Sequence, residues 1–268
     1  MTENETAGNE KMPDPEGYQE RMSKSIPDKV TWTKWIRSSD YQYVLDYGCA
    51  EGKVLKRIAQ KYPRKTYIGY DINANVIETA KKKFPGGFFS TDWDEAVKRC
   101  DPAQTVLMLT GVIHEVYSYL PKEEIDAFWQ RVYGSGFRYI FVRDWLVSER
   151  WFGKPVPQGV QDLICKRAPE TQLHEFSTHL GDHCGPLDTY DRLIHFLLKY
   201  KFTENWVHEI EEDYLSVSLE HFLNRIPDNY LQEYGQHYIL PYIKAQIRKD
   251  FGCYPAFQTH YKAILRLR

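Results

Sequence analysis

Short apolar segments alternate with amphipathic segments from residue 43 to residue 144. Apolar and β-branched runs predict strands at 43–47, 66–71, 87–90, 104–110 and 137–144. The intervening segments have the spacing of amphipathic helices at 53–62, 74–83, 94–100 and 122–134. The run at 104–110 is apolar nearly throughout, as a strand buried on both faces must be. This alternation predicts a doubly wound α/β fold built on a mostly parallel sheet.

The last part of the chain adds a hairpin to this pattern. Two further strands are predicted at 230–240 and 259–268, which brings the sheet to seven strands. A helix at 241–251 interrupts the hairpin. We expect all of residues 14–268 to form one domain, preceded by a polar, disordered tail at 1–13.

The segment between the fifth strand and the hairpin is too long for an ordinary crossover. It spans residues 146–228 and is predicted to contain helices at 189–200 and 218–225. Extra material after a parallel strand lies at the carboxyl end of the sheet, where α/β proteins bind their ligands. We therefore interpret 146–228 as a helical insertion, or lid, that recognises a substrate.

Composition narrows the function classes only slightly. The formal net charge is -2 and the pI is near 6.5, which indicates no global attraction to nucleic acid. Five cysteines without a C-x-x-C pair do not suggest a disulfide framework. The N-terminus is polar where a signal peptide would be apolar, and the apolar runs are too short to span a membrane. We expect a cytoplasmic protein with no membrane partner.

The turn after the first strand carries the most specific pattern in the chain. Asp46, Gly48 and Gly52 form D-x-G-x-x-x-G between the strand and a helix. A dinucleotide site needs G-x-G-x-x-G, so that backbone amides approach a pyrophosphate, and this turn does not supply it. The turn resembles motif I of the class I S-adenosylmethionine (SAM) methyltransferases, D-x-G-C-G-x-G. Cys49 also matches, and Ala50 departs by one methyl group.

The resemblance implies SAM as the cofactor and an antiparallel last strand. Asp71 ends the second strand at the distance where a carboxylate accepts both ribose hydroxyls, and Ile72 would lie under the adenine. Asp92 and Trp93 follow the third strand, where the family places an acidic residue at the adenine amino group and an aromatic flank. Each residue alone has an ordinary alternative as a helix cap, a turn or a core residue.

The methionine end of the cofactor would lie against Thr110 and Gly111, after the fourth strand. In similar methyltransferases, N-terminal helices close over the cofactor, which implies that Tyr18 covers this end. Helices are expected at 19–25 and 29–37. The alternative is that these helices only cap the sheet edge.

His114, Glu115 and Asp144 are the candidate catalytic residues. A neutral imidazole at His114 would take a proton from the acceptor, while Glu115 orients it or binds a cationic acceptor. Asp144 would bind the acceptor. The alternatives are that His114 opens a helix and hydrogen-bonds locally, and that Asp144 pairs with its neighbour Arg143.

The candidate acceptor-binding residues are Tyr117, Arg143, His179 and His183. The lid also contains Cys165, His174 and Cys184, but no metal-binding spacing anchors the set, so we expect no metal.

The predicted function is methyl transfer from SAM to an O or N nucleophile of an acceptor whose class, small molecule or RNA, the sequence does not identify. Methylation of RNA remains an alternative because of basic runs such as 81–83. A non-catalytic SAM-binding protein is the third alternative.

Overall fold

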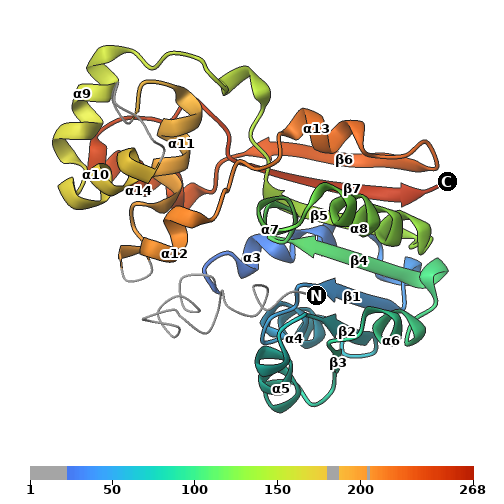
Figure 1. Cartoon of the computed structure of the whole chain (residues 1–268). Helices are drawn as coiled ribbons and strands as arrows, with labels where there is room; N and C mark the ends of the chain where they lie inside the picture. The colour runs from blue at the N-terminus through green and yellow to red at the C-terminus, as the bar shows by residue number, and fades with distance from the viewer. Residues whose placement is uncertain (1–22, 180–186, 204–205) are drawn as a thin grey trace.

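The structure, a computed structural model, describes residues 23–179, 187–203 and 206–268. A sheet with the strand order β3-β2-β1-β4-β5-β7-β6 runs through the protein (Figure 1). Strands β1 to β5 pair in parallel, whereas β7 pairs antiparallel with both β5 and β6. The predicted doubly wound α/β fold with its antiparallel last strand is confirmed. The strands are β1 (Tyr43–Tyr47), β2 (Thr66–Tyr70), β3 (Phe88–Ser90), β4 (Thr105–Thr110), β5 (Tyr139–Trp145), β6 (Tyr230–Tyr238) and β7 (His260–Leu267).

Helices cover both faces of the sheet, and each face has its own hydrophobic cluster. All six residues of β4 are buried, as the apolar run predicted. The first face is covered by α6 (Trp93–Lys98), α7 (Ile113–Tyr119), α8 (Lys122–Gly134) and α13 (Leu219–Asn224). The second face is covered by α4 (Lys53–Lys61), α5 (Ala74–Lys83) and the 3₁₀ turn η1 (Thr31–Lys34), with α3 (Ile26–Lys29) beside it. Shorter 3₁₀ turns lie at Ser38–Asp40, Pro102–Gln104 and Glu149–Trp151.

The lid forms a third hydrophobic cluster beyond the carboxyl ends of β1 and β4 (Figure 1). The helix predicted inside the hairpin belongs to this cluster, because Ile247 and Phe251 are buried in it. The last two strands of the sheet therefore also anchor the lid. The helices of this lid cluster are α9 (Gln158–Arg167), α10 (Glu170–His179), α11 (Tyr190–Lys199), α12 (Trp206–Glu211) and, from outside the predicted insertion, α14 (Pro241–Phe251). Helix α13 lies within the predicted insertion but packs on the sheet. Within the described ranges, no helix is long and apolar enough to cross a bilayer.

The predicted helix at 29–37 is replaced by α3 and η1. The hydroxyls of Thr31 and Thr33 donate to the carbonyls of Asp28 and Val30 at 2.8 and 3.0 Å, and so compete with helical hydrogen bonding. Trp32 is fully buried against Tyr41, which fixes the turn by tertiary packing. The tail at 1–13 and almost all of the helix expected at 19–25 lie outside the described residues.

Candidate functional site

The turn after β1 has the backbone conformation that its glycines predicted. Gly48 and Gly52 have φ values of 70° and 71°, in the left-handed region that favours glycine. A Cβ on Gly52 would come within 2.8 Å of the Phe89 ring. The amides of Gly48 and Cys49 donate to the carbonyl of Tyr70 at 2.8 and 2.9 Å, which ties the turn to the end of β2.

Ala50 also adopts a left-handed conformation, with φ of 44°. A side chain at such a φ is strained, by about 1 kcal/mol or more. The Ala50 amide donates to Asp71 Oδ2 at 2.9 Å, and Asp71 Oδ1 accepts from the Asn73 amide at 3.0 Å. The Asp71 amide in turn donates to the Ser90 carbonyl at 3.3 Å. The ends of β1, β2 and β3 are therefore joined at one place, with Asp71 at its centre.

Asp46 is a buried acid at the base of this junction of β1, β2 and β3. Only 1% of its surface is exposed, and its Oδ1 has no hydrogen-bond partner within the part of the chain that the structure describes. Burial raises the pKa of Asp46 to about 7, although the Lys29 ammonium opposes this shift. An unpaired buried carboxylate oxygen is costly unless a cation or a donor binds it.

Lys29, at the end of α3, is a residue that the sequence analysis missed. Its Nζ lies 3.5 Å from the position that a Cβ on Gly111 would occupy. Asp46, Asp144 and Glu115 all interact electrostatically with it. Burial and the nearby charge of Arg143 lower the pKa of Lys29. No motif marks this lysine, because only the fold brings it to the ends of β1 and β4.

Thr110 and Gly111 lie beside this lysine at the end of β4. Thr110 is 4% exposed, and Gly111 has a left-handed φ of 76°. The Gly111 amide donates to the Arg143 carbonyl at 2.9 Å, so the loop after β4 is tied to β5.

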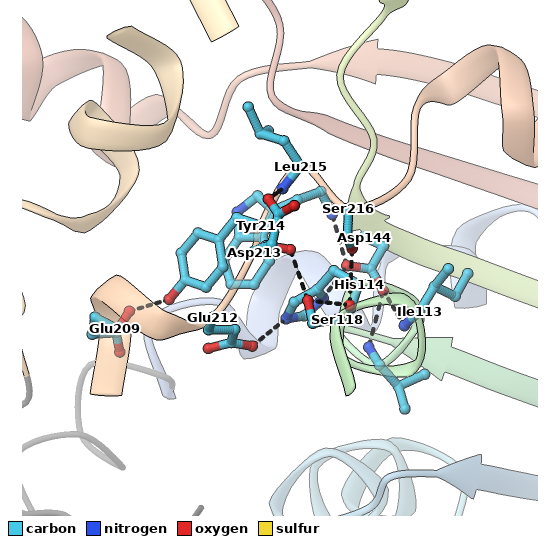
Figure 2. Close-up of polar contacts among 12 residues, drawn as sticks. Ile113, His114, Ser118, Asp144, Glu209, Glu212, Asp213, Tyr214, Leu215 and Ser216 are labelled. Atoms are coloured by element: carbon cyan, nitrogen blue, oxygen red, sulfur yellow. Dashed lines mark hydrogen bonds and ion pairs between the residues drawn. The ribbon is translucent and has the colours of Figure 1, made fainter. Parts of the chain in front are cut away.

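Asp144 has a different role from the predicted contact with an acceptor. It is fully buried, and its Oδ2 accepts hydrogen bonds from the amides of Val112 and Ile113 at 2.9 and 2.7 Å. Its Oδ1 accepts from the Trp145 amide at 2.8 Å and lies 2.6 Å from His114 Nδ1 (Figure 2). The carboxylate therefore caps the N-terminus of α7 and orients the imidazole.

His114 connects this cap to the lid. Its Nε2 lies 3.0 Å from Oε1 of Glu212, the residue after α12 (Figure 2). Burial lowers the pKa of His114, but the carboxylates of Asp144 and Glu212 outweigh it and raise the pKa to about 10. Both ring nitrogens are engaged in this arrangement. The expectation of a neutral imidazole base does not fit this geometry, whereas the alternative that His114 opens a helix does, since α7 begins at Ile113.

Aromatic rings and a buried lysine hold Glu212 in place. Trp145 stacks on Tyr214 with ring centroids 4.0 Å apart and meets the edge of His114 at 4.4 Å. Lys199, which is fully buried, donates to the backbone carbonyls of Glu209 and Glu212. The lid residue that faces His114 is therefore fixed by the interior of the lid.

Glu115, the next residue of α7 after His114, is exposed. Desolvation of the carboxyl by the surrounding protein is the main cause that raises the pKa of Glu115, to about 8. The positive charge of His114 lowers this pKa, whereas the carboxylates of Glu212 and Asp71 raise it. Tyr117, in contrast, faces the helix layer, because its hydroxyl accepts a hydrogen bond from Trp129 Nε1 at 3.0 Å. The predicted acceptor contact of Tyr117 is therefore not supported.

Arg143 pairs with α3 instead of facing an acceptor. It is 3% exposed, and its Nε donates to Asp28 Oδ2 at 2.9 Å. Lys262 Nζ donates to the other oxygen of Asp28 at 2.9 Å, and the Tyr238 hydroxyl also donates to this acid. Arg143 therefore belongs to a buried ion-pair network and, contrary to the prediction, does not face an acceptor carboxylate or phosphate. Its ion-pair partner is Asp28, not the neighbouring Asp144.

The adenine side of the predicted site is only partly supported. Ile72 is 48% exposed beside Asp71, as a residue under a ring would be. Asp92 is exposed and caps α6, accepting from the Glu95 amide at 3.1 Å. Trp93 is 7% exposed and packs against core rings such as Tyr47 and Tyr70, so it is a core residue here.

The lid contains a cavity of about 330 Å³. His179, at the end of α10, lines it, whereas His183 and Tyr18 lie outside the described residues. The cavity wall includes Glu212, so it adjoins the region of His114. The other described lining residues are Phe152, Asp191, Arg192, His195, Ile210, Glu211, Asp213 and Leu215.

The fold and the joined loops define a class I SAM-dependent methyltransferase domain. Residues 44–134 match a family model described as a methyltransferase domain. No curated protein matches the chain.

Solved structures support the fold. The plantazolicin methyltransferase BamL, in complex with a triazolic desmethylPZN analog and SAH, is 12% identical, with a TM-score of 0.53 over 94% of this chain and 88% of that one. The pyocyanin biosynthetic protein PhzM is 11% identical, with a TM-score of 0.51 over 97% of this chain and 60% of that one.

The residues present fit a bound SAM. The unpaired Oδ1 of Asp46 suits the ammonium of the methionine moiety, and Lys29 Nζ suits its carboxylate. Asp71, at the junction of three loops, can exchange its backbone partner for ribose hydroxyls. Ile72 offers an exposed apolar surface to the adenine.

Proposed function

We propose that the protein transfers the methyl group of SAM to an O or N nucleophile of a small-molecule acceptor bound between the sheet and the lid. One observation carries this proposal: Lys29 Nζ lies 3.5 Å from the position that a Cβ on Gly111 would occupy, at the end of β4, where the carboxylates of Asp46 and Glu115 both act on it. The cofactor and acceptor sides of the site are therefore contiguous, as an in-line transfer requires.

Methyl transfer is a displacement at the carbon bound to the sulfonium. The acceptor atom forms a new bond to this carbon while the carbon–sulfur bond breaks, and its electron pair stays on the sulfur of S-adenosylhomocysteine (SAH). The acceptor's proton passes to a base, and Glu115 is the exposed carboxylate at this position. His114 and Asp144 position the start of α7, which carries Glu115.

The acceptor side is rich in carboxylates, and this favours a small molecule over RNA. Glu211, Glu212 and Asp213 line the lid cavity, and Glu115 lies beside Glu212. A polyanion would be repelled by this surface. Helix α5, which ends in the basic run 81–83, packs on the opposite face of the sheet from α7.

A labelled-methyl screen tests the proposal. Purified protein and methyl-labelled SAM are incubated with separate metabolite, RNA and protein fractions of a lysate. We expect label in the metabolite fraction. We also expect Glu115→Gln to slow transfer by about 100-fold or more while SAH binding is retained. Glu123→Gln, an exposed change at the start of α8, is the matched control and should leave transfer unchanged.

Three results would contradict this assignment. Label found in RNA supports the nucleic-acid alternative. SAH binding without transfer to any fraction supports a non-catalytic SAM-binding protein. Full activity of Glu115→Gln removes Glu115 from the chemistry.

A further inference from the structure

His114, Glu115 and Glu212 bring one imidazole and two carboxylates to a single point. One nitrogen or oxygen atom from each side chain lies within 4.8 Å of the others. Two of the three residues come from α7, and the third follows α12 in the lid. The group therefore bridges α7, which packs on the sheet, and the lid.

The separations of these atoms, up to 4.8 Å, are slightly wider than those of ligands on one metal ion, so a small side-chain adjustment would bring them together. Ligand atoms about 2.1 Å from a divalent ion lie about 3 Å apart when adjacent in an octahedron, and about 4.2 Å apart when opposite. His114 Nε2 and Glu212 Oε1 are 3.0 Å apart. Glu115 is exposed and has no hydrogen-bond partner among the described residues, so it can adjust to an ion at low cost.

The surroundings of His114 are those of a metal-bound histidine. Its Nδ1 lies 2.6 Å from the fully buried Asp144. A carboxylate that accepts the other ring N–H is the usual outer partner of a histidine ligand, because it fixes the tautomer and aims Nε2 at the ion. Glu212 is similarly held, through the Lys199 hydrogen bonds to its own carbonyl and that of Glu209.

The local charge also favours a cation. Partial burial and the nearby carboxylates of Glu212, Glu115, Glu209 and Glu211 raise the pKa of the Tyr119 hydroxyl. Lys199 is committed to backbone carbonyls and so neutralises this cluster only in part. A divalent ion would supply the missing positive charge at the point where the carboxylates converge.

We propose that His114 Nε2, Glu115 and Glu212 form a binding site for a divalent cation that takes mixed nitrogen and oxygen ligands, such as Mn²⁺. The ion replaces the proton on Nε2 and takes one oxygen from each carboxylate. Because Glu115 is exposed, water or an acceptor oxygen can complete the coordination shell of the ion. This last role rests on the proposed function, whereas ion binding does not.

Titration of the full-length, EDTA-treated protein with Mn²⁺, followed by the electron paramagnetic resonance of free Mn²⁺, tests the site. We expect saturable binding of a single ion per chain. Glu115→Gln and Glu212→Gln should each weaken binding by about tenfold or more. Glu123→Gln is the control. It removes an exposed carboxylate at the start of α8, outside the cluster, and should leave the affinity unchanged.

Absence of Mn²⁺ binding overturns the proposal, and so does an equal loss in all three variants, which would indicate a diffuse acidic surface. Circular dichroism checks folding. If Glu212→Gln does not fold, Glu115→Gln decides the outcome, because this exposed side chain supports no described hydrogen bond. SAH binding is measured in the same metal-free preparation. Intact SAH binding without Mn²⁺ binding refutes the ion site and leaves the proposed function standing.

Discussion

Asp46 is the residue whose protonation state matters most for the cofactor side of the site. It is buried, one of its oxygens has no described partner, and burial raises its pKa to about 7. An acid with a raised pKa in the folded state stabilises the fold while it is protonated. That contribution is present at low pH and is lost as the pH rises from the ordinary range of an aspartic acid toward 7. A cationic ligand binds this carboxyl most strongly above about pH 7, where Asp46 is ionised.

SAM affinity should therefore rise with pH. If SAM binds only to ionised Asp46, its affinity increases about tenfold between about pH 6 and about pH 8. Calorimetric titration with SAM at several pH values measures this dependence. Asp46→Asn should bind SAM more weakly and without this slope. The same slope in Asp46→Asn would show that another group is responsible.

Lys29 gives a second residue-scale prediction. We expect its ammonium to bind the carboxylate of SAM, and a charge-assisted hydrogen bond is worth about 1.5–3 kcal/mol. Lys29→Met should therefore weaken SAM binding by about tenfold or more in a calorimetric titration. Lys34→Met, an exposed change in the adjacent turn η1, should have no effect. Tighter SAM binding by Lys29→Met would mean instead that Lys29 competes with the positively charged groups of SAM for Asp46.

At the scale of elements, the segment from α12 to Tyr214 determines how the lid meets the sheet. Lys199 of α11 holds the carbonyls of Glu209 and Glu212, and the Tyr214 ring stacks on Trp145 at the end of β5. Ser118 of α7 also donates to the Asp213 carbonyl at 2.9 Å. These contacts place Glu212 of the lid against His114 of α7, although Glu212 itself lies outside any helix or strand.

Lys199→Met should destabilise the lid. The substitution leaves two buried carbonyls without their donor, and we expect a loss of about 2–4 kcal/mol in the free energy of unfolding. Urea denaturation monitored by tryptophan fluorescence measures it. Lys201→Met removes a half-exposed ion pair with Asp250 and should cost less than about 1 kcal/mol. Equal effects of the two substitutions would contradict a specific role for Lys199.

The sequence predicts elements well where the signal is local. The strand and turn at Asp46 to Gly52 and the fully buried β4 follow from short patterns, and the structure confirms both. Trp93 illustrates the limit, because an aromatic residue after an acid does not reveal which face of the helix it will occupy. In the structure it enters the core.

Long-range contacts explain the remaining differences. Lys29 and Glu212 complete the site from segments far along the chain from the motif, and neither has a recognisable spacing. Arg143 and Asp144 are adjacent in sequence, but successive residues of a strand face opposite sides of the sheet, so they join different networks. These partners can be identified only from the packing of α3 and the lid against the sheet.

At the scale of the whole molecule, the sheet carries two functional sides that meet at Lys29. In our proposal, the joined ends of β1, β2 and β3 are the cofactor side, and α7 with the lid is the acceptor side. The lid is anchored at both ends of its sequence, by β5 and by the hairpin that contains α14. On the proposed function, this arrangement would hold an acceptor close to the cofactor and keep water away from the transfer.

Calorimetric titration of the purified protein with SAH tests the central claim most directly. The account predicts saturable binding of a single SAH per chain that Asp71→Ala weakens by about tenfold or more, because Asp71 joins the three loops and would hold the ribose. Asp94→Ala, an exposed change in the first turn of α6, is the control and should bind normally. Absence of SAH binding, or binding that Asp71→Ala leaves intact, would contradict the assignment of these loops as the cofactor site.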